Sequence, residues 1–336
     1  MNLRYNRHNL HRDRTITPCL RAGRTLVLFL MAGLSLLIAR TGFSASLTHN
    51  SANPDRSVES CHWVEHAMGR SCVPHRVRRL VVLDTGELDI SVGLGHLPVA
   101  TTYPYQINHL PDYIPADQTP ISVGLNSEPD LERILQLQPD LILGSRSVHG
   151  HLYPILSRIA PTVLSERIGV SWRDNLQLFA RALQQEQKAS DWLTGFEQQC
   201  QRINALYRQK GRPTVSVVRS MQDHVRLYLQ DTFIHTLLAQ CGIRRPENQD
   251  IKGFATRLRS PAQIRQLEGE LILLSEYSPE LGSMIRQWQG TGFWSLLKGR
   301  IVPVDDHYWM LGIGPLAAEQ VLHDLEAIIR AYTPSS

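Results

Sequence analysis

Arginines and aromatic residues that follow short apolar segments are the side chains of this chain best suited to binding chemistry. Segments such as 79–84 (RLVVLD) and 271–274 (LILL) have the length and composition of buried β-strands. Open α/β sheets bind ligands beyond the carboxyl ends of their strands, so the residues that follow these segments are candidates for ligand contact. The candidates are Thr85, Tyr103, Tyr105, Arg146, Arg167, Arg219, Tyr277, Tyr308 and Trp309. Arginine makes planar, bidentate contacts to carboxylates and aromatic rings cover apolar faces, so this set predicts a site for a bulky anionic or oxygen-rich ligand.

Motifs for catalysis are absent from the sequence. It contains no GxSxG, GxxxxGK[ST] or HExxH pattern, and no nucleophile stands beside a base. His149 and His151 have a spacing that could hold a metal ion, but histidines two apart in a polar turn are more often solvated. The sequence therefore predicts a binding protein and not an enzyme.

The pattern of residues 171–210 predicts helices, and we expect these helices to connect two similar halves of the chain. Their apolar residues recur in steps of three and four, with a slip in phase between Leu183 and Ala189. We therefore expect two abutting helices, and the second should contain about 23 residues. Ser171 and Asp174 resemble a capping box at the start, and the sequence 210–213 (KGRP) ends the helix.

The flanking segments form a weak internal repeat. Residues 134–143 (ILQLQPDLIL) and 264–273 (IRQLEGELIL) both read as the end of an amphipathic helix, a turn and a buried strand. Strands alternate with helices on both sides of the connector, which is typical of parallel sheets. The predicted fold is α/β, with two Rossmann-like lobes of mainly parallel sheets joined by a long rigid helix. Its boundaries are 78–170 for the N-terminal lobe, 171–211 for the linking helices and 212–336 for the C-terminal lobe.

The first 46 residues have the composition of a secretory signal peptide. Seven arginines accompany an apolar run, 25–39 (TLVLFLMAGLSLLIA), and small residues follow at 44–46. A membrane anchor is the alternative, although about 20 apolar residues are usual for a span. Because this segment carries seven Arg and one Asp, the net charge of +4 falls to −2 without it. That balance argues against nucleic-acid binding.

Four cysteines remain after the signal peptide, as expected for an exported chain. Cys61 and Cys72 bracket a short loop within the polar N-terminal segment 47–77, and we predict that they form a disulfide. A zinc site that includes the nearby histidines is the alternative. The sequence leaves open whether Cys200 and Cys241 pair.

Several motifs in this order resemble a known family. They are RRLVVLD at 78–84, VG at 123–124, EPDLERILQLQPDLIL at 128–143, IAPT at 159–162 and LLKGRIV at 296–302. Over residues 61–332 the chain resembles the substrate-binding proteins of iron–siderophore importers, above all those for ferric citrate and ferric hydroxamates.

The resemblance implies a periplasmic, monomeric protein that captures a ferric siderophore between two lobes and delivers it to an ABC permease. Iron would be bound only through the siderophore, so no cofactor and no protein ligand to metal are expected. By the same resemblance Glu132 would dock to the permease, and a second Glu would be expected near Ala262, where this chain has Ala followed by Gln263. Trp309 stands where the ferric citrate binder also has Trp. A corrinoid or haem binder on the same scaffold, a two-lobed periplasmic enzyme and a metal-storage protein remain alternatives.

Overall fold

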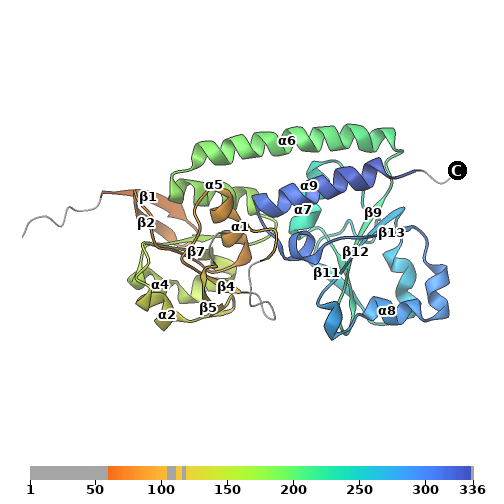
Figure 1. The fold of residues 1–336 in the computed structure, drawn as a ribbon, viewed down its shortest axis with the longest axis horizontal. Helices are drawn as coiled ribbons and strands as arrows, with labels where there is room; N and C mark the ends of the chain where they lie inside the picture. Colours follow the sequence, from red (N-terminus) through yellow and green to blue (C-terminus); the bar gives the residue numbers. More distant parts are fainter. Residues whose placement is uncertain (1–59, 104–110, 116–118, 334–336) are drawn as a thin grey trace, which may run out of the picture. The chain divides into compact units, whose positions relative to one another are not determined.

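The computed structural model describes residues 60–103, 111–115 and 119–333. The predicted signal peptide and Tyr105 therefore lie outside the described residues. The described chain contains two separate α/β sheets and a small hairpin. Figure 1 shows the first sheet near α1 and the second near α7 and α9.

The first sheet confirms the prediction of a mainly parallel sheet. Its strand order is β6-β5-β4-β3-β7-β8, and every pair is parallel except β5–β6. The strands are β3 (Leu80–Val82), β4 (Ala100–Tyr103), β5 (Ile121–Leu125), β6 (Glu128–Pro129), β7 (Leu141–Ser145) and β8 (Thr162–Ser165). The helices between them are α1 (Thr85–Gly93), α2 (Leu131–Gln136), α3 (Arg146–His149), the 3-10 turn η1 (Gly150–Leu152) and α4 (Tyr153–Ile159). Buried apolar strand residues form the core because helices cover the sheet on both faces.

The second sheet is only half parallel, which corrects the prediction for the C-terminal lobe. Its order is β11-β10-β9-β12-β13, with β12 parallel to β9 and β13, and β10 antiparallel to β9 and β11. A tight turn closed by Met221 N–H donating to the carbonyl of His224 (2.9 Å) joins β9 to β10. So short a connection cannot hold a crossover helix, so the two strands must be antiparallel. The strands are β9 (Val215–Ser220), β10 (Val225–Tyr228), β11 (Ala255–Leu258), β12 (Leu271–Glu276) and β13 (Arg300–Pro303).

Helical segments of the second half surround this sheet. Most of these segments are short. They are α7 (Phe233–Gln240), η2 (Pro261–Leu267), η3 (Pro279–Leu281), α8 (Met284–Gln289), η4 (Gly292–Leu296), the π-helical turn η5 (His307–Leu311) and α9 (Pro315–Arg330). In this half the sequence-based interpretation missed β11, η3, α8 and η5.

The two abutting connector helices are confirmed. They are α5 (Trp172–Leu183) and α6 (Glu186–Gln209), which has 24 residues. The break falls at Gln184, whose φ of 55° is left-handed and cannot continue a right-handed helix. The predicted capping box is wrong, because the Ser171 side chain makes no cap hydrogen bond.

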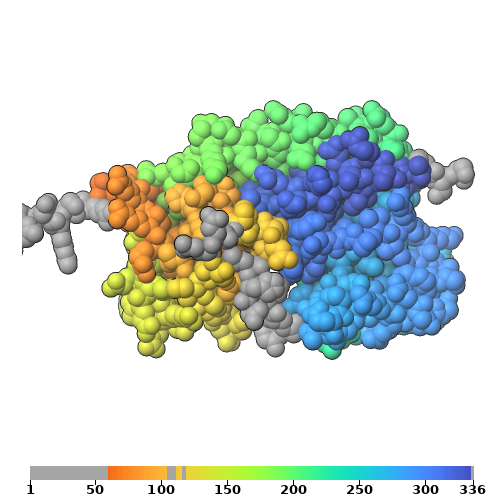
Figure 2. Space-filling view, in the orientation of Figure 1, coloured from red at the N-terminus to blue at the C-terminus, as the bar shows by residue number. Residues whose placement is uncertain are grey.

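Helix α6 does not stand alone as a strut, because the last helix of the chain packs along it. Figure 2 shows α6 in green and α9 in dark blue as neighbouring ridges of one surface. The buried residues of α6 recur at helical spacing and join the main core: Ala189, Leu193, Phe196, Cys200, Ile203 and Tyr207. The connection between the two halves is therefore a packed pair of helices.

The segment before the first lobe forms an antiparallel hairpin of β1 (Cys61–His66) and β2 (Gly69–Pro74). The predicted Cys61–Cys72 disulfide is confirmed and joins its two strands. The hairpin packs on the edge strand β8, where Ser71 Oγ donates to the carbonyl of Thr162 (2.8 Å). Covering that edge protects its unpaired backbone groups. No group of three or more metal-ligating side chains in the described ranges could hold a metal ion.

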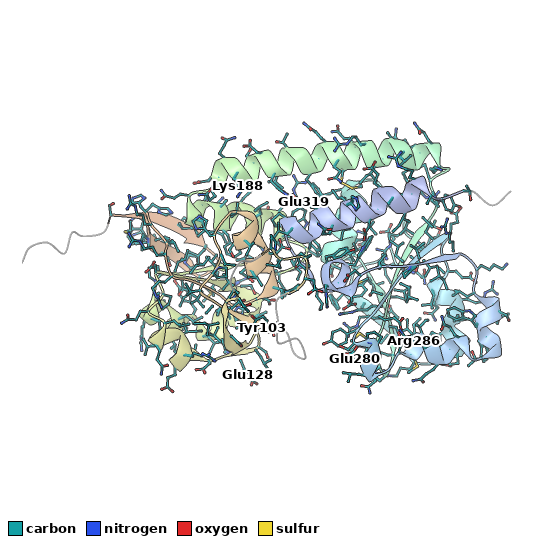
Figure 3. The ribbon with its side chains drawn as sticks, in the orientation of Figure 1. Tyr103, Glu128, Lys188, Glu280, Arg286 and Glu319 are labelled. Carbon is teal, nitrogen blue, oxygen red and sulfur yellow. A yellow bond between two sulfur atoms is a disulfide. The ribbon has the colours of Figure 1, made fainter. Side chains whose placement is uncertain are left out.

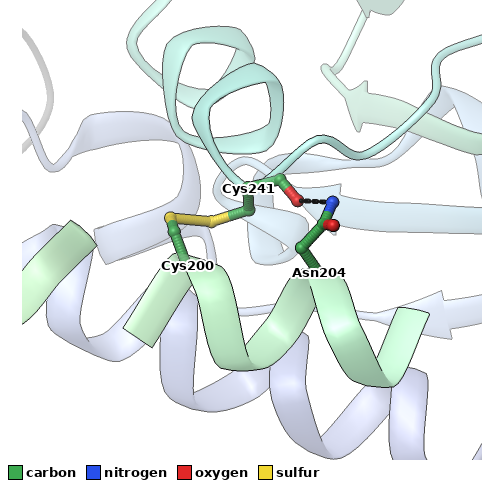
Figure 4. Close-up of a disulfide and its surroundings, with 3 residues drawn as sticks. All are labelled: Cys200, Asn204 and Cys241. Atoms are coloured by element: carbon green, nitrogen blue, oxygen red, sulfur yellow. Dashed lines mark hydrogen bonds between the residues drawn. A yellow bond between two sulfur atoms is a disulfide. The ribbon is translucent and has the colours of Figure 1, made fainter. Parts of the chain in front are cut away.

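A second disulfide settles the pairing that the sequence left open. Cys200 on α6 and Cys241 at the end of α7 are bonded, and both are buried. Figure 4 shows the bond beside Asn204, whose side-chain amide donates to the carbonyl of Cys241 (2.8 Å). The connector is thus covalently tied to the second half. Within the described ranges no helix is long and apolar enough to cross a membrane.

Candidate functional site

The parallel strands of the first sheet bring four predicted site residues to one edge. Thr85 follows β3, Tyr103 ends β4, Arg146 follows β7, and Arg167 lies two residues beyond β8. Adjacent parallel strands end at the same edge, so these residues share it although up to 82 positions separate them in sequence. The topology therefore assembles the first half of the predicted site.

The two arginines of this edge are both exposed but differ in their partners. Arg146 forms an ion pair with Glu166, and both side chains remain more than half exposed, at 52% and 56%. Arg167 is exposed, and its carbonyl accepts a hydrogen bond from Asn175 Nδ2 (2.8 Å). No described residue accepts a hydrogen bond from its guanidinium group. Among the described residues, the Arg167 guanidinium group therefore has no partner, and all of its N–H donors can bind a ligand.

Thr85 and Tyr103 are buried and already bonded to protein groups. Thr85 Oγ1 donates to the carbonyl of Leu311 (3.3 Å), which links α1 to η5. Tyr103, labelled in Figure 3, is 5% exposed, and its hydroxyl donates to the carbonyl of Pro120 (3.3 Å). In this arrangement neither side chain offers surface to a ligand, and their assignment as ligand residues stays a prediction.

Helix α1 carries three buried carboxyl groups that the sequence-based interpretation did not single out. Asp84 caps the helix by accepting from the Thr85 N–H (2.7 Å). Burial, and then the nearby Asp84 carboxylate, raise the pKa of Glu87 to about 8, and no described residue bonds to its two carboxyl oxygens. The signal available in the sequence was the acidic run 84–89 (DTGELD) inside an otherwise apolar segment.

Asp89 connects α1 to the start of α9. Its two carboxylate oxygens accept from the N–H groups of Leu316 (2.8 Å) and Ala317 (2.9 Å). Burial raises its pKa to about 7, although these two backbone N–H groups oppose the shift. The carboxylate thus satisfies N–H groups that have no partner within their own helix. Gly314 is required here, because a Cβ at that position would lie 2.4 Å from the Asp89 Oδ1 atom.

Arg219, at the carboxyl end of β9, is buried in an ion pair. Its Nε donates to Asp306 Oδ1 (2.7 Å), and a second guanidinium nitrogen bonds the other carboxylate oxygen. Ser275 Oγ donates to the same carboxylate (2.9 Å), and the guanidinium carbon lies 4.5 Å from the Tyr277 ring centroid. The side chains of Arg219 and Asp306 are only 6% and 12% exposed. The bidentate face that was predicted for a ligand is therefore occupied by Asp306.

Tyr308 and Trp309, in the π-helical turn η5, share one acceptor. Tyr308 Oη (2.8 Å) and Trp309 Nε1 (3.0 Å) both donate to Asp324 Oδ2 on α9. Burial, and then this hydrogen bond, raise the pKa of Tyr308. Trp309 is fully buried, whereas Tyr308 is half-buried. Of the two, Tyr308 has the surface that a ligand could reach, and the role of Trp309 stays a prediction.

His149 differs from the expectation that it is solvated. It is fully buried, its Nδ1 accepts from the Ser145 N–H (3.1 Å), and its Nε2 bonds the carbonyl of Asn126 (2.9 Å). Burial lowers its pKa, although Asn126 and Asp84 oppose the shift. His149 therefore holds the loops beyond β5 and β7 together.

The predicted docking residue Glu132 lies in the first turn of α2 and is exposed. Glu128, labelled in Figure 3, precedes the same helix and is also exposed. Ala262, the corresponding residue of the second half, is exposed at the start of η2, where Gln263 and Ser260 form a capping box. The two halves thus present different chemistry at equivalent positions.

A hollow of about 770 Å³ lies away from the strand ends, beside the Cys200–Cys241 disulfide. Its walls come from α5, α6 and the end of α7, and include Arg173, Glu197 and Arg208. Since ligands of open α/β sheets bind beyond the strand ends, we do not assign the ligand to this hollow.

Comparisons with known proteins agree with this architecture. The family model described as periplasmic binding protein matches residues 80–254. The probable siderophore-binding lipoprotein YfiY of Bacillus subtilis is 30% identical over 317 residues, which cover 90% of this chain and 96% of YfiY. The Fe(3+) dicitrate-binding periplasmic protein FecB of Escherichia coli is 26% identical over 302 residues, covering 88% of this chain and 93% of FecB.

Among solved structures, Staphylococcus aureus SirA complexed with staphyloferrin B shares the fold. Its TM-score is 0.68 at 24% identity, with 79% of this chain and 97% of SirA covered. The family model spans more than half of the chain, and YfiY matches nearly its whole length. The chain belongs to the periplasmic binding protein family.

Proposed function

We propose that this protein is exported, captures a ferric siderophore of the citrate or hydroxamate type, and delivers it to an ABC permease. The relatives named above support the class of ligand, since YfiY is described as siderophore-binding and FecB as Fe(3+) dicitrate-binding. An achromobactin-binding periplasmic protein of Dickeya dadantii, 27% identical over 266 residues, supports it further. Iron would be held by the siderophore, without cofactor or protein ligands, and a monomer would suffice.

Arg167 is the observation that carries the proposal. It stands at the ligand-binding edge of the first sheet, exposed and without an acceptor among the described residues. Arg146 lies at the same edge in a solvated pair, so a ligand carboxylate can exchange with Glu166 at little cost. Two such guanidinium groups suit an anionic chelate, because their contacts to carboxylate are bidentate.

A titration of tryptophan fluorescence with the mature protein tests the class of ligand. Residues 47–336 are titrated with ferric citrate, a ferric hydroxamate, a ferric catecholate, haem and cobalamin. Saturable quenching by ferric citrate or the hydroxamate supports the proposal. Quenching by haem or cobalamin alone would favour the corrinoid or haem alternative. Failure of every ferric chelate to bind would refute the proposal.

Arginine variants test the site in the same assay. We expect Arg167→Ala to weaken binding about tenfold or more, since a lost charge-assisted hydrogen bond costs roughly 1.5 to 3 kcal/mol. Arg146→Ala should have a smaller effect, because Arg146 is solvated and shared with Glu166. Arg202→Ala, an exposed change on α6, is the matched control. Unchanged binding in both the Arg167 and the Arg146 variant would indicate that the aromatic residues, and not these arginines, recognise the ligand.

A further inference from the structure

Three arginines form a row across the second sheet. Arg219 on β9 lies opposite Arg226 on β10, which in turn lies opposite Arg257 on β11. Directly opposite residues of antiparallel strands point to the same face of a sheet, so the three side chains share one face. The row begins at the carboxyl end of β9, which is the edge where α/β sheets bind ligands. Figure 1 labels β9 and β11, the first and last strands of the row.

The charges of this row are not balanced. Asp306 neutralises Arg219, as described above. Arg226 is partly buried, and its Nε is buried without an acceptor in the part of the chain that the structure describes. Arg257 is exposed and also lacks an acceptor among the described residues. Like charges directly opposite each other destabilise a sheet, so an anion bound between Arg226 and Arg257 would relieve a repulsion that the protein otherwise retains.

An aromatic surface adjoins Arg226, one of these two arginines. The Phe254 side chain is 57% exposed, and its ring centroid lies 5.9 Å from the guanidinium carbon of Arg226. The ring of Tyr228 meets Phe254 edge to face, with centroids 5.5 Å apart. A ligand at this place would meet two cationic groups beside an exposed apolar ring. That combination matches a chelate that presents carboxylates on a carbon framework.

We propose that Arg226 and Arg257 form an anion-binding site at the outer edge of the second sheet, which takes carboxylate groups of the ferric chelate. The inference rests on the proposed function and specifies the ligand as a carboxylate-bearing chelate. It also replaces Arg219 as the cationic contact from the second half, since Asp306 already occupies Arg219. The buried ion pair of Arg219 and Asp306 would then fix the first end of the row.

The test compares ferric citrate, metal-free citrate and the ferric complex of desferrioxamine B, a hydroxamate without coordinating carboxylates. Wild type, Arg226→Gln, Arg257→Gln, the double variant and the control Arg202→Gln are titrated at 50 and 300 mM NaCl. We expect the double variant to bind ferric citrate about tenfold or more weakly, with a shallower dependence on salt. Binding of the hydroxamate complex and binding by Arg202→Gln should change less than twofold.

Each other outcome decides a separate point. Double-variant binding of ferric citrate within twofold of wild type would overturn the site while leaving the proposed function intact. Equal losses for ferric citrate and metal-free citrate would support a site for free polycarboxylates, and would overturn its assignment to the chelate. No binding of any ferric chelate by wild type would refute the proposed function and this inference together. If the double variant does not fold, Arg257→Glu alone is used, because Arg257 is exposed, and it should weaken ferric citrate binding more than Arg257→Gln does.

Discussion

The two lobes share a plan but not its chemistry. Residues 134–143 and 264–273 each end a helical segment and enter a strand, and those strands, β7 and β12, each lie beside the first strand of their lobe. Yet the first lobe exposes Arg146 and Arg167 at its strand ends, whereas the second buries Arg219 against Asp306. Repetition of a backbone pattern therefore does not repeat the electrostatics of a site.

The reason lies in where each counter-charge comes from. Glu166 is 20 residues from Arg146, and both side chains face solvent. Asp306 is 87 residues from Arg219, lies in the connection after β13, and forms with Arg219 a largely buried pair. A solvated pair can exchange with a ligand at little cost, but breaking a buried pair leaves an uncompensated charge. Arg146 is thus a better exchangeable anion contact than Arg219, and an anion contact in the second lobe has to come from arginines other than Arg219.

Removal of the disulfides should have the largest effect on stability, and the effect should differ between the two bonds. The Cys200–Cys241 bond closes a separation of 41 residues and the Cys61–Cys72 bond one of 11. From loop-closure entropy we expect Cys200→Ala/Cys241→Ala to lower the free energy of unfolding by about 4 kcal/mol and Cys61→Ala/Cys72→Ala by about 3 kcal/mol. Unfolding in guanidinium chloride measures both values. A hairpin variant that loses as much as the α6–α7 variant would contradict the expectation.

The buried acids of α1 should make the first lobe sensitive to alkaline pH. The pKa of Glu87 in the folded protein is about 8, above its ordinary value, so the folded state holds a proton that the unfolded state has released. The stabilisation is complete below the unfolded pKa and is lost as pH rises through 8. Wild type should lose on the order of 2 kcal/mol between pH 6 and 8.5, and Glu87→Gln should lose less.

Urea midpoints across this pH range measure the effect. Glu276→Gln in the second lobe is the control. Burial would raise the Glu276 pKa, but the hydrogen bonds from Arg286 and Ser283 outweigh it, so that the pKa is lowered. Its contribution is therefore present throughout this range and is lost only on acidification. Equal slopes for wild type and Glu87→Gln would show that Glu87 does not carry the pH dependence.

Asp89→Ala removes the carboxylate that joins α1 to α9. The N–H groups of Leu316 and Ala317 then lose their acceptor, and we expect a loss of about 1 to 2 kcal/mol, as for a removed helix cap. Asp174→Ala in α5 is the matched control, since Asp174 is exposed. Thermal unfolding of both variants measures the difference, and equal melting temperatures would argue against the cap.

The smallest effect on stability is expected at the proposed docking surface. Glu132→Ala changes an exposed side chain, so the free energy of unfolding should move by less than about 0.5 kcal/mol. Affinity for the chelate should be unchanged, while iron uptake by cells that depend on this protein should fall. Leu135→Ala, an exposed change on the same helix, serves as the control for uptake. Normal uptake with Glu132→Ala would exclude docking through this carboxylate.

Local signals in the sequence determined the elements and the resemblance. The spacing of apolar residues predicted α5 and α6, and the slip after Leu183 placed their boundary near Gln184. Apolar runs between turn residues predicted the parallel strands, and the short spacing of Cys61 and Cys72 predicted their disulfide. These features depend on neighbours within a few residues to a dozen, which a single sequence displays directly.

Tertiary structure alone decided which candidate site residues are available. Arg146, Arg167 and Arg219 look alike in the sequence. In the structure Arg146 forms an exposed ion pair with Glu166, and Arg219 forms a buried one with Asp306. None of the described residues binds the guanidinium group of Arg167. The row of Arg219, Arg226 and Arg257 likewise depends on the antiparallel register of β9, β10 and β11. Most of these contacts join residues tens of positions apart. Whether such residues meet depends on the order and direction of the strands in a sheet, which local patterns do not encode.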